Sequence, residues 1–575
     1  MTRAKLLRRT LLAAFISWLV VSGAFFALAF VDAKKGRDAL VAFRAEATSE
    51  SLRSGAADAE LRRTSVLLRR SHDRLHNPVV RPFHWLPVAG RQLRSADALT
   101  GAGAEVTAVT LDSLVSARAL TDEIKVDKAG ALSKIAVIAS NAEARLAKVD
   151  LGPDEAVFAQ LAKARNEIAS NLTDVRTTLG RAAGGARGVS RLFQSNGSYL
   201  LIAANNAEMR AGAGMFLSVG SLKTGGGEVT LSKMETVAST LDVDAATVPW
   251  PEELHKLWSF MGKQGDMRNL MLSPRFDVSA PLAAEIWKQD GRGQVDGVLV
   301  IDPSLLQAML RATGPVALDD RQVTAESVLT ELLVDQYRTI SPTGSTDASQ
   351  VARREGLSAV AEGAFGALNE GRWDPIVMAR ELGKAADGRH LLAWSRDEAQ
   401  NADWRAAGVG GLLGADSLML NISNVGSNKL DSFLQVSADM AEVTGRSGLD
   451  LSVTVTIKNT VPAGAPRYVL GPSPGTGLEA GEYRGMLSFS LPGDANAPRF
   501  DADVPVVAFG PDGPTKVIAG VVRVKRGETK TFVVRFSRPA TARFTLVEPS
   551  ARLPATNWTY RQERWTDASR YVISH

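Results

Sequence analysis

The chain has 575 residues, of which 45% are hydrophobic and 22% charged, with 50 glycines, 24 prolines and no cysteine. This length and hydrophobic content exclude a wholly disordered or fibrous protein and predict about three to four domains. The lack of cysteine excludes disulfides, thiolate metal sites and cysteine nucleophiles, and a formal net charge of only +5 does not indicate a nucleic-acid-binding protein.

The first predicted element is a transmembrane helix at Leu11–Val31, a run without any charged residue. At about 1.5 Å per residue it reaches about 30 Å, the thickness of a bilayer's hydrocarbon core. Basic residues precede it, which predicts a cytoplasmic tail at 1–10 and an extracytoplasmic location for the rest: Arg3, Lys5, Arg8 and Arg9. A cleaved signal peptide is the alternative, since Ala27-Leu28-Ala29 has the small-x-small form, but the apolar run exceeds a usual signal peptide's and favours an uncleaved anchor.

Residues 32–190 are predicted to form a helical stalk. Apolar residues recur at helical spacing between Pro153 and Val175, and an alanine-rich segment at 96–124 predicts a second long helix. Three prolines between residues 77 and 90 predict a break between helices. The first of these helices is expected to end at the glycines that follow it, Gly180, Gly184 and Gly185.

Residues 191–440 alternate strand and helix signals, which predicts an α/β domain. The expected strands are 199–204, 215–219 and 298–301, and the expected helices are 304–311, 325–337 and 352–368.

Residues 441–550 are predicted to form an all-β sandwich, because short alternating strands are separated by Gly- and Pro-rich segments. The expected strands are 449–457, 485–491, 504–509, 517–524 and 531–536, and Arg526-Gly527 is expected to close a hairpin between the last two. The tail at 551–575 is aromatic and polar and has no clear assignment.

The stalk contains two features with chemical content. His72 and His76 are spaced to share a helix face, but a zinc site would need further ligands that no recognised motif supplies, so no metal site is predicted. The stretch 51–94 is rich in arginine and poor in acids. It would either attract anionic headgroups or phosphate-bearing polymers, or simply form a solvated helix face.

A dense polar cluster follows the first predicted strand of the α/β domain: Asn205, Asn206, Glu208 and Arg210, with small residues at 211–214. Ligands of open α/β sheets bind where strands end, and small residues let a ligand approach the backbone. The alternative is a turn in which these side chains cap backbone groups.

The segments 199–216, 295–316 and 428–431 resemble the signature blocks of the bacterial domain-of-unknown-function 4012 family, here Tyr-Leu-Leu-Ile-Ala-Ala-Asn-Asn-Ala-Glu-Met-Arg, Val-Asp-Gly-Val-Leu-Val-Ile-Asp-Pro and Asn-Lys-Leu-Asp. The anchor, the stalk and the terminal β-domain also match that family's layout. The family name implies no activity.

The order of these blocks more distantly resembles the LytR-CpsA-Psr family of envelope phosphotransferases, which move glycopolymers from polyprenyl-pyrophosphate carriers to the cell wall. This resemblance implies a LytR-CpsA-Psr-like central domain in which Arg210, Arg353 and Arg354 grip pyrophosphate, near Asn205, Asn206 and Glu208. It also implies that Glu208 orients Arg210 or a metal, and that acids hold a magnesium ion. Asn205 and Asn206 stand where an acid is expected, so no cofactor is predicted, and magnesium belongs only to the phosphotransferase alternative.

Two functions stay open. One is a non-catalytic, membrane-anchored scaffold or partner in assembly of the bacterial envelope or its exopolysaccharide. The other is a LytR-CpsA-Psr-like phosphotransferase, or a binder of polyprenyl-pyrophosphate-linked glycans. The expected partners are the membrane, a polyprenyl-phosphate lipid or wall glycan, and envelope proteins, with no nucleic acid.

Overall fold

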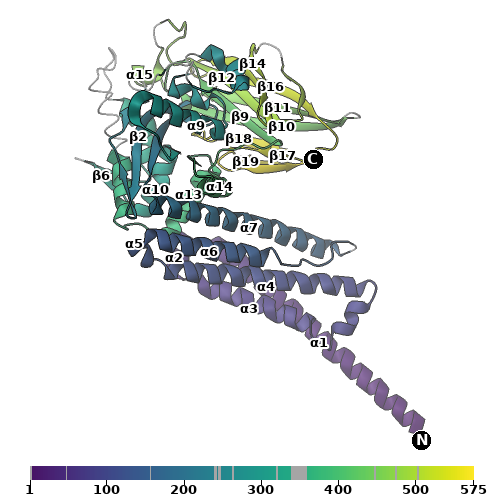
Figure 1. Ribbon diagram of the computed structural model, residues 1–575. Helices are drawn as coiled ribbons and strands as arrows, with labels where there is room; N and C mark the ends of the chain where they lie inside the picture. Colours follow the sequence, from purple (N-terminus) through teal and green to yellow (C-terminus); the bar gives the residue numbers. More distant parts are fainter. Residues whose placement is uncertain are drawn as a thin grey trace. The chain divides into compact units, whose positions relative to one another are not determined.

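The computed structural model describes the chain except for 1–2, 47, 156, 238–242, 244–247, 262–264, 319–320, 339–358, 446–447, 473–474 and 502–503. The described chain forms two compact units, 1–186 and 187–575, and each is considered by itself (Figure 1).

The first unit is helical. Its elements are α1 (Arg3–Glu46), α2 (Ser49–Ser54), α3 (Asp58–Leu75), η1 (Arg81–Trp85), α4 (Ala89–Ala119), α5 (Glu123–Val126), α6 (Lys128–Leu146) and α7 (Ala159–Gln194), whose last turns belong to the second unit. α3 packs against both α1 and α4, and α4 packs against α6. Val109, Leu146 and Leu172 join α4, α6 and α7 in one apolar cluster.

Helix α1 contains the predicted apolar run and continues beyond it to Glu46. The part from Thr10 to Phe43 is long and apolar enough to cross a membrane, and only 6% of its most apolar window is buried. The prediction of an N-terminal apolar helix followed by a helical region is therefore confirmed.

Helix α7 differs from its prediction at both ends. It begins at Ala159, not at Pro153, and it runs through Gly180 and the two glycines after it to Gln194. A glycine inside a helix costs about 1 kcal/mol relative to alanine. Leu172 and its neighbours in the cluster with α4 and α6 stabilise this helix enough to offset that cost.

The second unit begins with a mixed sheet in the order β3-β2-β1-β5-β8, with β4 paired to β2. The strands are β1 (Ser198–Met209), β2 (Gly214–Gly225), β3 (Glu228–Leu231), β4 (Glu235–Thr236), β5 (Gly297–Ile301) and β8 (Leu391–Ser395). β1 and β5 are parallel, while β2 and β8 run antiparallel to their neighbours. This order confirms an α/β middle region and places the end of β5, at Ile301, beside Ala203 of β1.

Helices and one short hairpin connect these strands. They are α8 (Glu252–Trp258), η4 (Ser259–Met261), η5 (Met267–Leu272), α9 (Phe276–Trp287), η6 (Lys288–Arg292), α10 (Pro303–Thr313), β6 (Val316–Leu318), β7 (Arg321–Val323), α11 (Val328–Leu333), η7 (Asp335–Tyr337), α13 (Pro375–Asp387) and α14 (Glu398–Ala406). The predicted helix at 352–368 lies partly outside the described residues, and 359–369 are helical.

The C-terminal region is β-rich and contains two six-stranded sheets. One has the order β13-β16-β11-β10-β18-β19 and the other the order β14-β15-β12-β9-β17-β20. The elements are β9 (Ser417–Asn424), η8 (Asp431–Phe433), β10 (Leu434–Gly445), β11 (Gly448–Asn459), α15 (Arg467–Leu470), β12 (Tyr483–Pro492), β13 (Asn496–Phe500), β14 (Val506–Asp512), β15 (Thr515–Val524), β16 (Thr529–Arg538), β17 (Phe544–Val547), β18 (Asn557–Tyr560), β19 (Glu563–Thr566) and β20 (Tyr571–Ser574).

One apolar core contains residues of both sheets. Leu420 of β9 and Phe489 of β12 share a cluster with Val453 of β11 and Val534 of β16. The unassigned tail also belongs to this region, because β18, β19 and β20 complete the two sheets and Trp558 is buried in the shared cluster.

One prediction about the β-rich region is wrong. Arg526-Gly527 does not close a hairpin, because β15 pairs with β12 and β14 while β16 pairs with β11 and β13; the turn crosses from one sheet to the other. The two sheets include strands that begin before residue 441, namely β9 at Ser417 and β10 at Leu434. β9 lacks an exposed face, so its sequence does not show the polar and apolar alternation of a half-buried strand.

Candidate functional site

Three residues of the predicted strand-end cluster, Asn205, Asn206 and Glu208, lie within strand β1, and Arg210 follows its last residue. β1 extends to Met209, and its pairing with β2 is irregular between Asn205 and Met209, where the strand bulges. Gly214 allows this geometry, since a Cβ there would overlap the backbone of Asn205. The bulge turns Asn205, Asn206 and Glu208 toward neighbours that the regular part of the strand does not meet.

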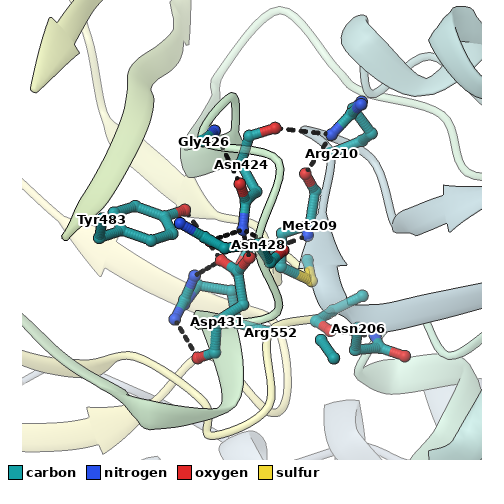
Figure 2. Close-up of polar contacts among 12 residues, drawn as sticks. Asn206, Met209, Arg210, Asn424, Gly426, Asn428, Asp431, Tyr483 and Arg552 are labelled. Atoms are coloured by element: carbon teal, nitrogen blue, oxygen red, sulfur yellow. Dashed lines mark hydrogen bonds and ion pairs between the residues drawn. The ribbon is translucent and has the colours of Figure 1, made fainter. Parts of the chain in front are cut away.

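Arg210, the predicted phosphate-gripping residue, is buried, with 7% of its surface exposed. One guanidinium nitrogen donates to the carbonyl oxygens of Met209 at 3.0 Å and Asn424 at 2.9 Å (Figure 2). Burial lowers the pKa of Arg210 to about 10, and the nearby charge of Asp431 opposes this shift. The side chain therefore holds β1 to the end of β9.

Asp431 is the centre of this network (Figure 2). One of its carboxylate oxygens accepts from the N–H of Met209 at 3.2 Å and from the amide of Asn424 at 2.8 Å. The other accepts from the hydroxyl of Tyr483 at 2.9 Å and from Arg552 at 3.2 Å. Burial raises the pKa of Asp431, opposed by the positive charge of Arg552. Asp431 and Arg552 form an ion pair with both side chains fully buried.

Glu208 forms an ion pair with Lys429, and both side chains are nearly buried. Burial lowers the pKa of Lys429 to about 8, and the charge of Asp431 opposes this shift. The ion-pair partner of Glu208 is therefore the ammonium group of Lys429, and not the guanidinium group of Arg210.

The two asparagines are also used internally. Asn205 donates to the hydroxyl of Tyr337 at 2.8 Å. Asn206 is fully buried and donates to Asp302 at 3.0 Å and to the carbonyl of Ala551 at 2.8 Å. Both amides therefore fix β1 against other elements of the second unit.

Asp302 joins this cluster to helix α10 and to His390. One carboxylate oxygen caps the helix by accepting from the N–H of Leu305 at 3.0 Å. The other lies 2.6 Å from Nδ1 of His390, which is buried. Burial would lower the pKa of His390, but the charge of Asp302 and its hydrogen bond raise it overall.

The structure thus brings together the three sequence blocks at 199–216, 295–316 and 428–431. Asn206 binds Asp302 of the second block, and Glu208 and the backbone of Met209 bind the third. The side chains of Asn205, Asn206 and Glu208 bind other segments of the chain in this structure. The expected partners Arg353 and Arg354 lie outside the described residues.

Sequence reasoning missed several members of this network. Asp302 carried a signal, because an aspartate directly before a proline and an apolar helix is typical of a helix cap. Arg552, Tyr483 and His390 carried none, since each is distant in the sequence from the aspartate it contacts.

A second polar cluster lines a hollow of about 820 Å³ in the first unit. The Nδ1 atoms of His72 and His76 lie 2.7 and 3.2 Å from the two carboxylate oxygens of Asp97. The hydrogen bond to Asp97 raises the pKa of His72 despite its partial burial. Among the described residues, no group of three or more His, Cys, Asp or Glu is arranged to hold a metal ion.

Residues 194–337 match the family described as "Protein of unknown function (DUF4012)". The match runs from the end of α7 through η7 and includes Asn205, Asn206, Glu208 and Arg210. Neither the curated proteins nor the solved structures contain a match to the chain.

Proposed function

We propose that this member of the DUF4012 family is a membrane-anchored protein of the bacterial cell envelope that acts outside the cytoplasm as a non-catalytic scaffold or partner in envelope or exopolysaccharide assembly. The observation that carries the proposal is the burial of Arg210. A phosphate-gripping arginine must present its N–H groups to a ligand, whereas Arg210 donates to two carbonyl oxygens inside the protein.

The anchor part of the proposal rests on α1. Its apolar segment is exposed and long enough to span a bilayer once, and the basic residues before it favour a cytoplasmic N-terminus. The remaining chain, including the second unit, would then lie on the outer side of a single-pass protein.

Two further proposals concern the fold of the second unit. We infer that the two six-stranded sheets pack face to face as a sandwich, which the shared cluster of Leu420, Phe489, Val453 and Val534 supports. We also infer that the α/β region is related to the LytR-CpsA-Psr fold but has different chemistry, because amides replace the expected acids at Asn205 and Asn206.

A strain lacking the gene provides the test, with exopolysaccharide yield as the readout. Two variants address the predicted grips: Arg210→Lys and the double variant Arg353→Gln with Arg354→Gln. Lysine keeps the charge but loses the paired N–H geometry of a phosphate grip. The scaffold function predicts that each variant restores the yield in proportion to the amount of folded protein in the membrane.

The contrary result is equally specific. If the double variant accumulates as folded protein at the wild-type level but restores no exopolysaccharide, the phosphotransferase function is favoured and the scaffold proposal fails. A magnesium ion would then be expected as part of the phosphotransferase site. A polyprenyl-phosphate lipid should co-purify with the wild-type protein and not with the double variant.

A further inference from the structure

The segment between α3 and α4, residues 77–88 (the tip loop), packs on the apolar part of α1. The indole N–H of Trp18 donates to the carbonyl of Val79 at 2.8 Å, and the hydroxyl of Ser22 donates to the same oxygen at 3.4 Å. Phe83 stacks on Trp18 with ring centres 4.8 Å apart and meets Phe26 edge-on at 5.4 Å. The loop is therefore fixed to the helix that is proposed to span the membrane.

These contacts lie well inside the apolar run. At about 1.5 Å per residue, Phe26 lies about 8 Å and Trp18 about 20 Å from Val31, the outer end of the run. Only about 13 Å of helix separates Trp18 from Arg9, and a hydrocarbon core is about 30 Å thick. The middle of the apolar run lies about 15 Å from Val31, so Trp18 lies just beyond it. Helix α1 can therefore span a bilayer only if the tip loop reaches about the middle of the hydrocarbon core.

The end of α3 marks the outer boundary. Arg74 forms an ion pair with Asp32 and donates to the carbonyl of Leu28 at 3.2 Å. This charged pair lies at the outer end of the apolar run, where a membrane surface is expected. The tip loop begins after it and continues along α1 toward Trp18.

The outer surface of the tip loop is apolar. Trp85 is 86% exposed, Val88 67% and Leu86 47%. Such neighbouring exposed apolar side chains are unfavourable in water, and tryptophan is enriched where proteins enter a bilayer. Because this surface adjoins the exposed apolar face of α1, the environment that suits both is lipid.

The loop backbone also suits a site with little water. Asn77 accepts from the N–H groups of Val80 and Arg81, both at 3.0 Å. The N–H of Phe83 donates to Val80 at 3.0 Å, and that of Leu86 donates to Phe83 at 3.2 Å. Prolines have no N–H to satisfy, and the loop contains three: Pro78, Pro82 and Pro87. Unpaired backbone donors are the main barrier to non-helical chain in a bilayer, and the loop has few.

The polar side chains of the tip loop face a polar hollow rather than acyl chains alone. Arg81 and His84 line the hollow of about 820 Å³, together with Arg94 and Asp97 of α4. Charged side chains at membrane depth face polar cavities or extend to the headgroups, and a long arginine side chain reaches either.

We propose that the tip loop inserts into the hydrocarbon core of the bilayer beside α1, from the outer side to about the middle, so that two elements of the chain hold the first unit in the membrane. This inference rests on the proposed single-pass anchoring. The ligand chemistry is the acyl chains of the bilayer, contacted by Trp85, Leu86 and Val88.

The absence of cysteine allows a direct test with single labels. The full-length protein is reconstituted in vesicles of phosphatidylcholine and phosphatidylglycerol, and an environment-sensitive fluorophore is attached at one of three positions: Trp85→Cys, Val20→Cys in α1 and Val126→Cys. Val20 and Val126 are 67% and 90% exposed, and Val126 follows the opposite end of α4 from the loop. Each label is quenched either by aqueous iodide or by a spin label on the lipid acyl chains.

The proposal predicts that the label at 85 behaves like the label at 20, with several-fold weaker iodide quenching than at 126 and strong quenching by the acyl-chain spin label. If 20 is in lipid but 85 is quenched by iodide like 126, insertion is overturned and the anchor stands. If 85 is shielded from iodide but not quenched from the lipid, a protein surface covers the loop, and insertion is again overturned. If the label at position 20 is itself not in lipid, the proposal that α1 spans the membrane is overturned, and the insertion of the tip loop is overturned with it.

Discussion

The buried ion pair of Asp431 and Arg552 illustrates how single residues hold the second unit together. Removing one partner leaves a buried charge without compensation, which typically costs about 3–5 kcal/mol. We therefore expect Arg552→Met to lower the unfolding free energy of the full-length protein by about this amount in urea titrations followed by tryptophan fluorescence. Asp431 accepts four hydrogen bonds in this network, so methionine also removes one of its donors.

A surface pair provides the matched control. Arg535 and Asp501 are both over 40% exposed, so water and salt screen their attraction. Arg535→Met should leave the unfolding midpoint unchanged within error. Equal effects of the two arginine substitutions would contradict the structural role of Asp431.

The buried pair of His390 and Asp302 should make the thermal stability of the protein depend on pH. Its pKa is raised in the folded protein because Asp302 and, more weakly, Asp567 favour the protonated ring. An unfolded histidine titrates near pH 6.5, so the stabilising contribution is complete below about pH 6.5 and is lost as the pH rises through the higher folded pKa. The thermal midpoint of the wild-type protein should decrease as the pH rises above about 6.5. The midpoint of His390→Asn should decrease less over the same range, because asparagine can donate to Asp302 without titrating. Parallel pH profiles of the two proteins would exclude this role.

At the residue scale, the sequence predicts which residues form the polar cluster but not which groups their side chains bind. Asn205, Asn206, Glu208 and Arg210 are adjacent in the chain, so their proximity is readable. Their partners Lys429 and Asp302 come from distant segments, and only the tertiary structure shows that these side chains face the interior. A polar run after an apolar strand has the same appearance whether it binds a ligand or clamps the fold.

Among the elements, the junction of β1 and β2 is the most sensitive to sequence. Gly214 pairs with Met209 across the bulge, and an added Cβ would overlap the backbone of Asn205, which cannot move without breaking the strand pair. Overpacking of this kind costs about 1–3 kcal/mol. Gly214→Ala should therefore lower the unfolding midpoint.

Helix α13 offers the comparison for this glycine. Gly383 lies inside the helix with no atom within 4 Å of an added Cβ, so Gly383→Ala should stabilise the protein by up to about 1 kcal/mol. If Gly214→Ala were also stabilising, the close approach at the bulge would be wrong.

Regular elements with a clear period were the most predictable. The strand around 449–457 and the helix around 304–311 both occur, because one buried face sets their pattern. The strand around 199–204 also occurs, and its signal is a continuous apolar run that is buried on both faces. The end of α7 and the turn at 526–527 were not predictable. A glycine does not show whether packing continues a helix through it, and a turn signal does not show whether the two strands it joins belong to the same sheet. Packing carries α7 through its glycines, and sheet assignment makes the turn a crossover.

At the scale of the whole molecule, the sequence indicated the order of an apolar helix, a helical region, an α/β region and a β-rich region. It did not show that residues from all three blocks of the second unit share one buried network, nor that the C-terminal tail completes both sheets. These features depend on contacts between residues hundreds of positions apart, which no local pattern encodes.

The central claim is that α1 crosses the membrane once and leaves the body of the chain outside. Single cysteines at position 2, as Thr2→Cys, and at the exposed Val126, as Val126→Cys, test it in the otherwise cysteine-free chain with a membrane-impermeant maleimide on intact cells. The account predicts labelling at 126 in intact cells and labelling at 2 only after the cells are permeabilised. Labelling at 2 in intact cells, or protection of 126 until permeabilisation, would contradict it.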